Sequence, residues 1–221
     1  ISVPEEIKNW LHREKKLFID GEWCDDQQNE QFEDWNPATE EILSSVALAG
    51  KADVDRAVKA ANDAFRLGEW RKKSLKSRAK VLLRLADLIE KHRAPLALIE
   101  SLDTGKPIRE TYDGDVVRAA QNFRFFAEYA LELENPEYEN GSDIHYTMRE
   151  AMGVAVLITP WNLPLYLESW KIAPALLMGN SCILKPSELS PLSATYLTEL
   201  IEELHLPRGV FQLLHGFGDK S

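Results

Sequence analysis

The stretch GVAVLITPWNLPLYLESWKIAPALLMGNSCILKPSE, residues 153–188, decides the fold of this chain. It begins with an uninterrupted apolar run, residues 154–158, which predicts a parallel strand covered on both faces. Pro160 ends that strand because it has no N–H to donate, and Pro164 suits the first turn of a helix. A second apolar run, residues 182–184, leads into a second strand end. The stretch therefore predicts a βαβ unit with polar residues at the carboxyl ends of its strands.

The segments after this unit extend the same pattern. One apolar face is expected on the helix inside the unit, because apolar residues recur there at three- and four-residue steps: Leu163, Leu167, Trp170, Pro174 and Leu177. A second helix is predicted for residues 190–204, a third buried strand for 210–214 and a tight turn for 215–218. The fold class is therefore α/β, a Rossmann-like doubly wound parallel sheet of which one mononucleotide-binding half is present.

The residues before position 153 divide into three predicted parts. Residues 1–16 form an N-terminal extension, and residues 17–135 form the helical part of a cofactor-binding domain that starts with a hairpin turning at Asp20-Gly21. Helices are predicted for residues 53–65, 74–92, 95–102 and 108–133, and a short strand for 42–49. Residues 136–152 read as a projecting β arm, whose unpaired edge suggests pairing with another segment or subunit. Residues 153–221 are the βαβαβ half.

Composition narrows the class of protein. The formal charge of −10 and the lack of a basic stripe argue against a nucleic-acid partner. No apolar run approaches the roughly 20 residues of a membrane span, and no signal peptide is apparent, so no membrane partner is expected. Cys24 and Cys182 lie far apart without metal-ligand spacing, which fits a reducing compartment and predicts no disulfide and no metal site. We expect a cytoplasmic protein.

Several collinear motifs resemble the NAD(P)-dependent aldehyde dehydrogenase family. The signature is PWNLP at residues 160–164 followed by WKIAPALLMGNSCILKPSE at 170–188. Weaker matches lie in the same order around it: FIDGEW at 18–23, NPAT at 36–39, DTGKP at 103–107 and GVFQLLHGFG at 209–218. The resemblance implies an N-terminal cofactor-binding portion with NAD as cofactor, an aldehyde substrate oxidised to a carboxylic acid, and a homo-oligomer. PWNLPLYL is similar to the branch that acts on muconic-type semialdehydes, with betaine-aldehyde-like and aliphatic branches left open.

The resemblance assigns a catalytic role to Asn162. In the family a cysteine thiolate adds to the aldehyde, hydride passes to the nicotinamide, and the thioester is hydrolysed. The side-chain amide of Asn162 would donate to the oxyanion, a role suited to an amide held in a turn by two prolines. The alternative from the residues alone is an Asn that only caps the turn. Lys171 matches a lysine proposed for proton relay, against the alternative of a solvated or ion-paired lysine.

The resemblance also assigns cofactor and substrate contacts. Lys185 and Glu188 would contact the adenosine ribose, and Glu188 would favour NAD over NADP because a carboxylate repels a 2′-phosphate. The alternative is a surface ion pair after a strand. The remaining cofactor positions are Ile158, Thr159, Pro160, Trp161, Gly216 and Gly218, although a simple turn also explains the two glycines. Leu163, Leu167 and Trp170 resemble the residues of the aldehyde tunnel, although an apolar helical stripe equally fits a core.

The resemblance places the family's nucleophile and its glutamate base beyond residue 221, so we expect the catalytic domain to lie outside this chain. Cys182 is expected to be buried in mid-strand and inert, and Cys24 lies in the N-terminal hairpin. We therefore expect the isolated chain to be inactive as a dehydrogenase and prone to association. A second hypothesis is that the chain is a natural truncated product that serves as a non-catalytic binding or interaction module.

Overall fold

A five-stranded mixed sheet forms the centre of the molecule in the computed structural model, which describes residues 3–218. Its strand order is β2-β1-β9-β8-β7, with β1 (Leu17–Ile19), β2 (Glu22–Cys24), β7 (Val154–Ile158), β8 (Ser181–Lys185) and β9 (Phe211–Leu213). The strands β7, β8 and β9 are parallel, and β1 pairs antiparallel with β9. The predicted βαβαβ order is confirmed, and the N-terminal hairpin extends the same sheet.

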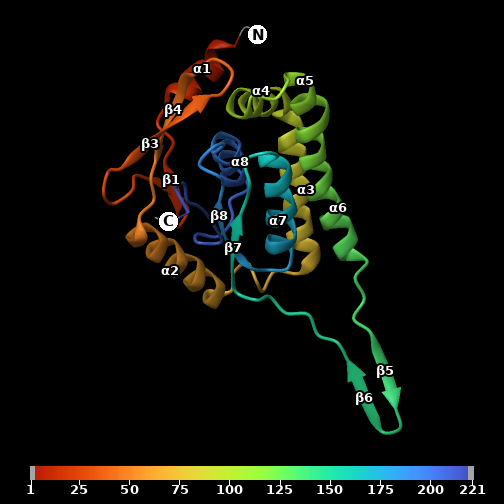
Figure 1. Ribbon diagram of the computed structural model, residues 1–221. Helices are drawn as coiled ribbons and strands as arrows, with labels where there is room; N and C mark the ends of the chain where they lie inside the picture. The colour runs from red at the N-terminus through yellow and green to blue at the C-terminus, as the bar shows by residue number, and fades with distance from the viewer. Residues whose placement is uncertain (1–2, 219–221) are drawn as a thin grey trace.

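Helices cover the two faces of the sheet, as Figure 1 shows. On one face lie α7 (Pro164–Leu177) and α8 (Leu192–Glu202), with α3 (Leu75–Lys91) and α6 (Val116–Leu131) packed behind α7. On the other face lies α2 (Lys51–Leu67). Successive side chains of a strand point to opposite faces, so Leu184 joins the core around α7 while its neighbour Ile183 joins the core under α2.

The remaining elements form a cap at one end of the sheet. They are α1 (Glu5–His12), the two-stranded sheet of β3 (Gln31–Asn36) and β4 (Glu41–Ala47), α4 (Arg93–Thr104), α5 (Ile108–Glu110) and a π-helical turn, η1 (Thr111–Asp115). The single helix predicted for residues 108–133 is therefore interrupted by η1. The strand β3 was not predicted, because QFEDWN is mostly polar and only two of its residues are buried.

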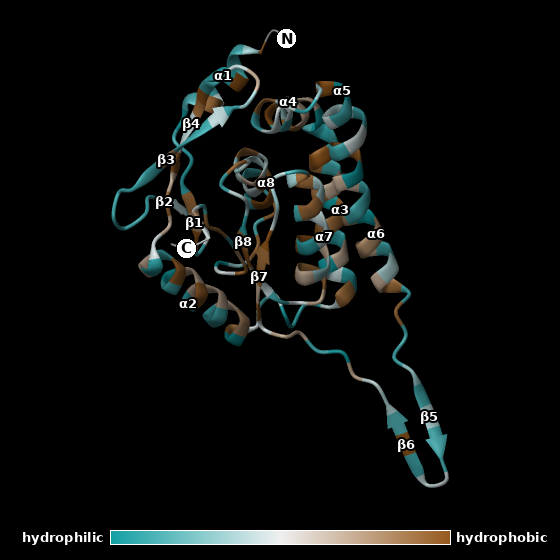
Figure 2. Cartoon of the chain, viewed as in Figure 1, coloured by the Kyte–Doolittle hydropathy of each residue, from teal (hydrophilic) through white to brown (hydrophobic). Residues whose placement is uncertain are grey.

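The prediction that β7 is covered on both faces is wrong. Leu157 is buried in the main core, but Val156 and Ile158 on the opposite face are 56% and 62% exposed. The strand lies at the edge of the sheet, and α2 packs mainly over β8 on that side. Figure 2 shows the apolar colour of this edge strand. A continuous apolar run shows that both faces of a strand are apolar. It does not show which of the two faces other residues of this chain cover.

The predicted apolar face of α7 is confirmed at Leu177 but wrong at Trp170. The buried side is offset from it and is lined by Leu165, Glu168, Ser169, Ile172, Ala173, Leu176 and Leu177. Of the residues named for the face, Leu163 and Leu167 are half-buried and Trp170 is 51% exposed. The sequence misled because apolar residues occur on both sides of this helix while two polar residues lie on its buried side.

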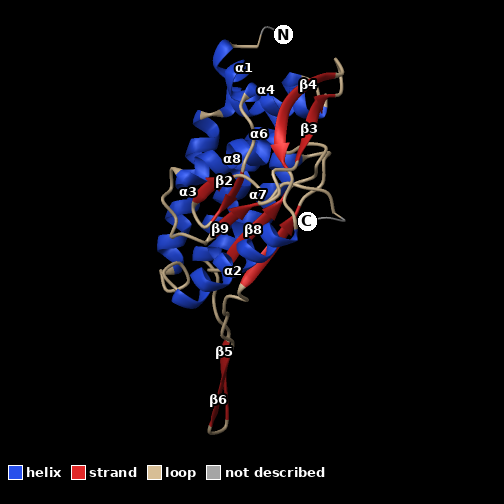
Figure 3. Cartoon of the chain, turned by 90° about the vertical axis from the view of Figure 1, so that its left-hand side faces the viewer, coloured by secondary structure: helices blue, strands red, loops and turns tan. Residues whose placement is uncertain are grey.

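The arm predicted for residues 136–152 is a hairpin of β5 (Glu137–Asn140) and β6 (Asp143–Tyr146). It extends away from the helices and the sheet (Figures 1 and 3), and all eight strand residues are exposed. Tyr138 stacks on His145 within the hairpin, with ring centroids 4.7 Å apart. A two-stranded hairpin is marginally stable by itself, so its apolar side chains are available for a partner.

Candidate functional site

The carboxyl ends of the three parallel strands meet at one edge of the sheet. Ile158, the last residue of β7, lies opposite Lys185, the last residue of β8, so their side chains share the face that α2 leaves open. Lys185 Nζ donates to the carbonyl oxygen of Gly216, in the turn after β9, at 2.7 Å. Thr159 N donates to the carbonyl oxygen of Lys185 at 3.1 Å. These bonds fix the three strand ends relative to one another.

The lysine at this edge is partly desolvated. Burial lowers the pKa of Lys185, and the nearby carboxylate of Glu188 opposes that shift. The side chain of Glu188 is half-buried on the loop between β8 and α8, and among the described residues its carboxylate accepts no hydrogen bond. The ammonium group of Lys185 and the carboxylate of Glu188, which accepts no hydrogen bond from the described residues, therefore lie close together at the carboxyl ends of the strands. Open α/β sheets bind their ligands at this edge.

Asn162 lies on the exposed turn between β7 and α7. Ser190 Oγ, on the loop after β8, donates to the carbonyl oxygen of Trp161 at 3.3 Å and ties the two loops together. The Asn162 side chain is exposed, and no hydrogen bond of its amide is formed within residues 3–218. The hypothesis that this Asn only caps the turn has no support in the structure, because the helix N-terminus receives its bond from elsewhere.

A buried hydroxyl without a partner lies beside this turn. Thr159 is 3% exposed, and its Oγ1 atom forms no hydrogen bond in the described part of the chain. Pro160 and Trp161 next to it are exposed, and Trp161 is 58% exposed. This edge therefore offers an apolar surface with unused polar atoms, as a site for an amphipathic ligand requires.

The residues predicted for the substrate lie on the outer side of α7. Leu163 and Leu167 are half-buried, and Trp170 contacts Tyr166 edge to face, with ring centroids 5.4 Å apart. Lys171 is exposed on the same helix and forms no ion pair among the described residues. Trp170 is therefore not part of the core, whereas Leu163 and Leu167 are partly covered beside the Asn162 turn.

Neither cysteine lies at the carboxyl end of a parallel strand. Cys182 is fully buried within β8, and burial raises the pKa of its thiol. Cys24 ends β2, where Arg56 Nη2 lies 2.9 Å from its Sγ atom, and burial raises the pKa of that thiol as well. A nucleophile needs an accessible thiolate, so neither residue has the surroundings of one.

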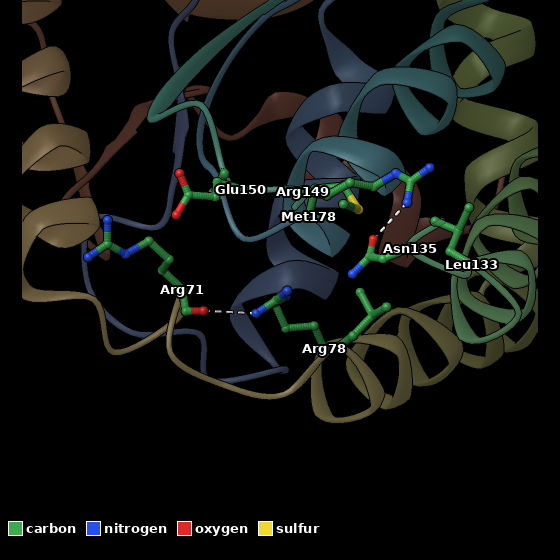
Figure 4. Close-up of a pocket in the computed structure, with 9 residues that line it drawn as sticks. Arg71, Arg78, Leu133, Asn135, Arg149, Glu150 and Met178 are labelled. Atoms are coloured by element: carbon green, nitrogen blue, oxygen red, sulfur yellow. Dashed lines mark hydrogen bonds between the residues drawn. The ribbon is translucent and has the colours of Figure 1, made fainter. Parts of the chain in front are cut away.

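A pocket of about 410 Å³ at the base of the arm, shown in Figure 4, is lined by three arginines but lies at the wrong end of β7. Two of the arginines already bond the backbone, because Arg78 donates to the carbonyl oxygens of Arg71 and Leu177, and Arg149 donates to that of Glu134. The guanidinium of the third, Arg71, lies over the ring of Phe65. We do not assign this pocket to the site. Within the described residues there is also no cluster of histidine, cysteine and carboxylate side chains that could hold a metal ion.

The family model for "Aldehyde dehydrogenase family" matches residues 23–221, which is most of the chain. The chain belongs to the aldehyde dehydrogenase family. It is 45% identical over 210 residues to the NADP/NAD-dependent aldehyde dehydrogenase PuuC of Escherichia coli (strain K12), covering 94% of this chain and 42% of that protein. It is 40% identical to retinaldehyde dehydrogenase 3 of Homo sapiens, covering 98% of this chain and 43% of that protein.

The fold of this aldehyde dehydrogenase chain agrees with solved structures. An NAD⁺ complex of an aldehyde dehydrogenase from Bacillus cereus superimposes with a TM-score of 0.95 at 39% identity, covering all of this chain and 45% of that one. The chain thus spans less than half the length of these relatives. Its sheet, helices and arm correspond to the N-terminal part of the family fold.

The sequence analysis of this aldehyde dehydrogenase chain did not identify Glu100, a residue beside the site. Glu100, on α4, is fully buried and reaches the first turns of both α7 and α8. In the segment LALIESLD, residues 96–103, Glu100 continues the apolar stripe of Leu96 and Ile99. An acidic residue at such a position could have indicated its role. An acid in such a stripe is rarely fully buried unless it has a partner.

Proposed function

We propose that this chain supplies the cofactor-binding and oxyanion-binding part of an aldehyde dehydrogenase that oxidises an aldehyde to a carboxylic acid with NAD. The observation that carries the proposal is the arrangement of the parallel strand ends, where Ile158 and Lys185 share an open face beside the exposed Asn162 turn. Family membership supports the reaction class. The branch acting on muconic-type semialdehydes stays a prediction.

The residues at the strand ends suit a dinucleotide. Lys185 and Glu188 would hold the ribose of the adenosine, with the ammonium as donor and the carboxylate as acceptor. Ile158, Pro160 and Trp161 would supply the apolar contact area, and Thr159 has an unused hydroxyl that could bond the ligand. Gly216 and Gly218 lie in the turn after β9, and a Cβ atom on Gly218 would meet nothing within 4 Å, so the need for glycine there rests on the motif alone. NAD, when bound, accepts the hydride.

The proposed task of Asn162 is to stabilise the negative charge that develops on the aldehyde oxygen. Its amide makes no bond within the described chain, so it is free to donate to that oxygen. Leu163, Leu167 and Trp170 would contact the rest of the aldehyde from α7. Lys171 is proposed for proton relay, and its exposure allows it to exchange protons with solvent.

The proposal is tested by assaying the full-length protein that contains this chain with NAD and a panel of aldehydes. We expect NADH formation at 340 nm with at least one aldehyde. A folded protein that oxidises no aldehyde in the panel would contradict the proposal. NAD binding by the 221-residue chain itself, measured by calorimetry, distinguishes a cofactor-binding part from a module that binds something else.

Replacing the oxyanion donor should affect turnover more than binding. In the full-length protein we expect Asn162→Ala to lower kcat by about 100- to 1,000-fold, because a preorganised donor acts mainly on the transition state. The KM for NAD should stay nearly unchanged. Lys76→Ala, at an exposed position in the first turn of α3, serves as a control. Equal kinetic constants for Asn162→Ala and wild type would remove Asn162 from the mechanism.

Association and location complete the proposal. We propose that the β5–β6 hairpin pairs with another subunit in a homo-oligomer, supported by its exposed Tyr138, Ile144 and Tyr146.

The net charge of −10 supports the absence of a nucleic-acid partner. Among residues 3–218, no helix combines the length and apolar character that crossing a bilayer requires. Two free cysteines support a cytoplasmic location.

A further inference from the structure

The helices α7 and α8 both begin without a capping side chain of their own. Leu163 precedes α7 and Pro191 precedes α8, and neither provides a side-chain hydrogen bond to its helix. The first N–H groups of a helix have no partner within it, so a buried N-terminus needs an acceptor from elsewhere. Pro164 removes one of these donors from α7, which leaves the N–H of Leu165 as the first one to satisfy.

The acceptors come from α4. Glu100 Oε2 accepts from the N–H of Leu165 at 3.3 Å and from Ser193 Oγ, in the first turn of α8, at 2.9 Å. Three residues later on the same face of α4, Asp103 Oδ2 accepts from the N–H of Leu192 at 2.9 Å. A carboxyl oxygen can accept such bonds whether or not the group carries its proton. The helix α4 therefore holds the starts of both helices that follow the parallel strands.

We propose that Glu100 is a positioning residue for Asn162, an inference that rests on the proposed function of Asn162. The turn of residues 160–163 is anchored on one side by β7 and on the other by the first residues of α7. Glu100 holds the N–H of Leu165, three residues after Asn162, while Ser190 holds the carbonyl oxygen of Trp161. Together the two contacts fix the position from which the Asn162 amide donates.

The surroundings of Glu100 show that this contact is specific. The nearby charged groups are Glu168 on α7, Asp115 on η1, Lys106 before α5 and Asp103 on α4. Lys106 pairs with Asp115, so Glu100 has no ion-pair partner of its own. Glu168 is equally buried and lies on α7 as well, but neither of its oxygens forms a hydrogen bond within the described chain. Glu168 therefore provides a matched control: a buried carboxyl group in the same region without a positioning contact.

The test compares Glu100→Ala, Glu100→Gln and the control Glu168→Gln in the full-length protein. We expect Glu100→Ala to lower kcat by about 10- to 100-fold with little change in the KM for NAD, because small displacements of a catalytic group cost that much. Glu100→Gln keeps one carbonyl acceptor and should recover most of the loss. Glu168→Gln should change kcat less than about twofold, as expected for a residue without a contact to the turn.

Two further measurements separate positioning from loss of fold. In an Asn162→Ala background, Glu100→Ala should have almost no additional effect on kcat, because residues that act as one unit are non-additive. Amide hydrogen exchange should be faster at Leu165 in Glu100→Ala but not in Glu168→Gln. If Glu100→Ala does not fold, the same comparison is made with Glu100→Gln, in which Leu165 should exchange faster by a smaller factor.

The outcomes are distinct from those of the proposed function. A wild-type protein that oxidises no aldehyde would refute the function, and the exchange rate at Leu165 would still decide whether Glu100 holds α7. Unchanged exchange at Leu165 in the Glu100 variants, or independent effects of Glu100→Ala and Asn162→Ala on kcat, would overturn the positioning role.

Discussion

Glu188, at the edge of the sheet, is the side chain that we propose decides between NAD and NADP. Glu188 is half-buried beside Lys185, and its carboxylate is free among the described residues to accept from ribose hydroxyls. Since a carboxylate repels the 2′-phosphate of NADP, we expect Glu188→Gln to raise the ratio of kcat/KM for NADP over that for NAD by about tenfold. Steady-state kinetics with both cofactors measure this ratio. A ratio that stays at the wild-type value would show that Glu188 does not contact the ribose.

The buried carboxyl group of Glu168 makes stability depend on pH. Burial raises the pKa of Glu168 well above its usual value, and burial raises that of Glu100 to about 7. In the unfolded chain both groups titrate near about 4.3. The folded state therefore keeps protons that the unfolded state has released, and the free energy of unfolding falls as the pH rises from about 4 through 7.

Glu168→Gln removes one of these titrations. We expect the variant to gain stability relative to wild type as the pH rises, so that the difference in unfolding free energy is larger at pH 8 than at pH 5. Urea denaturation of the chain at both pH values gives this difference. Parallel stability curves for the two proteins would mean that Glu168 is not buried with its proton.

At the scale of elements, the sequence predicted the order of strands and helices apart from β3 and the π-helical turn η1, but not which sides of β7 and α7 are buried. The motif residues Asn162, Lys185 and Glu188 could be placed at strand ends, because a proline and a change of period mark those ends. The offset of the buried side of α7 could not be predicted, since Glu168 and Ser169 replace apolar residues there and Trp170 is exposed. Contacts such as that of Glu100 join segments distant in sequence, and local patterns do not encode them.

Substitutions on the two faces of the edge strand β7 test whether only one of these faces is buried. Leu157→Ala should lower the free energy of unfolding by about 2–5 kcal/mol, because it leaves a cavity in the main core. Val156→Thr, on the exposed face, should change it by less than about 0.5 kcal/mol. Urea denaturation of the two variants compares them. Similar losses from both would mean that the second face of β7 is also covered in solution.

At the scale of the whole molecule, the hairpin arm is separate from the core. Replacing Tyr138, Ile144 and Tyr146 by serine should leave the unfolding free energy nearly unchanged, because all three side chains are exposed. The same change should reduce the size of the homo-oligomer that we propose for the full-length protein, measured by sedimentation velocity. Leu67→Ser, at another exposed apolar site, is the control. An unchanged oligomer would remove the arm from the subunit interface.

The pairing of β1 with β9 has a consequence for the time course of synthesis. Asp20 N donates to Gln212 Oε1 at 2.7 Å, and the two residues are separated by 192 positions in the chain. At about 5–20 residues per second, a ribosome takes roughly 10–40 s to make the residues between them. During that interval Leu17, Phe18 and Ile19, all buried in the finished fold, have no central sheet to join. The first strand made can pair with β2 at once, but it is among the last to complete its pairing in the central sheet.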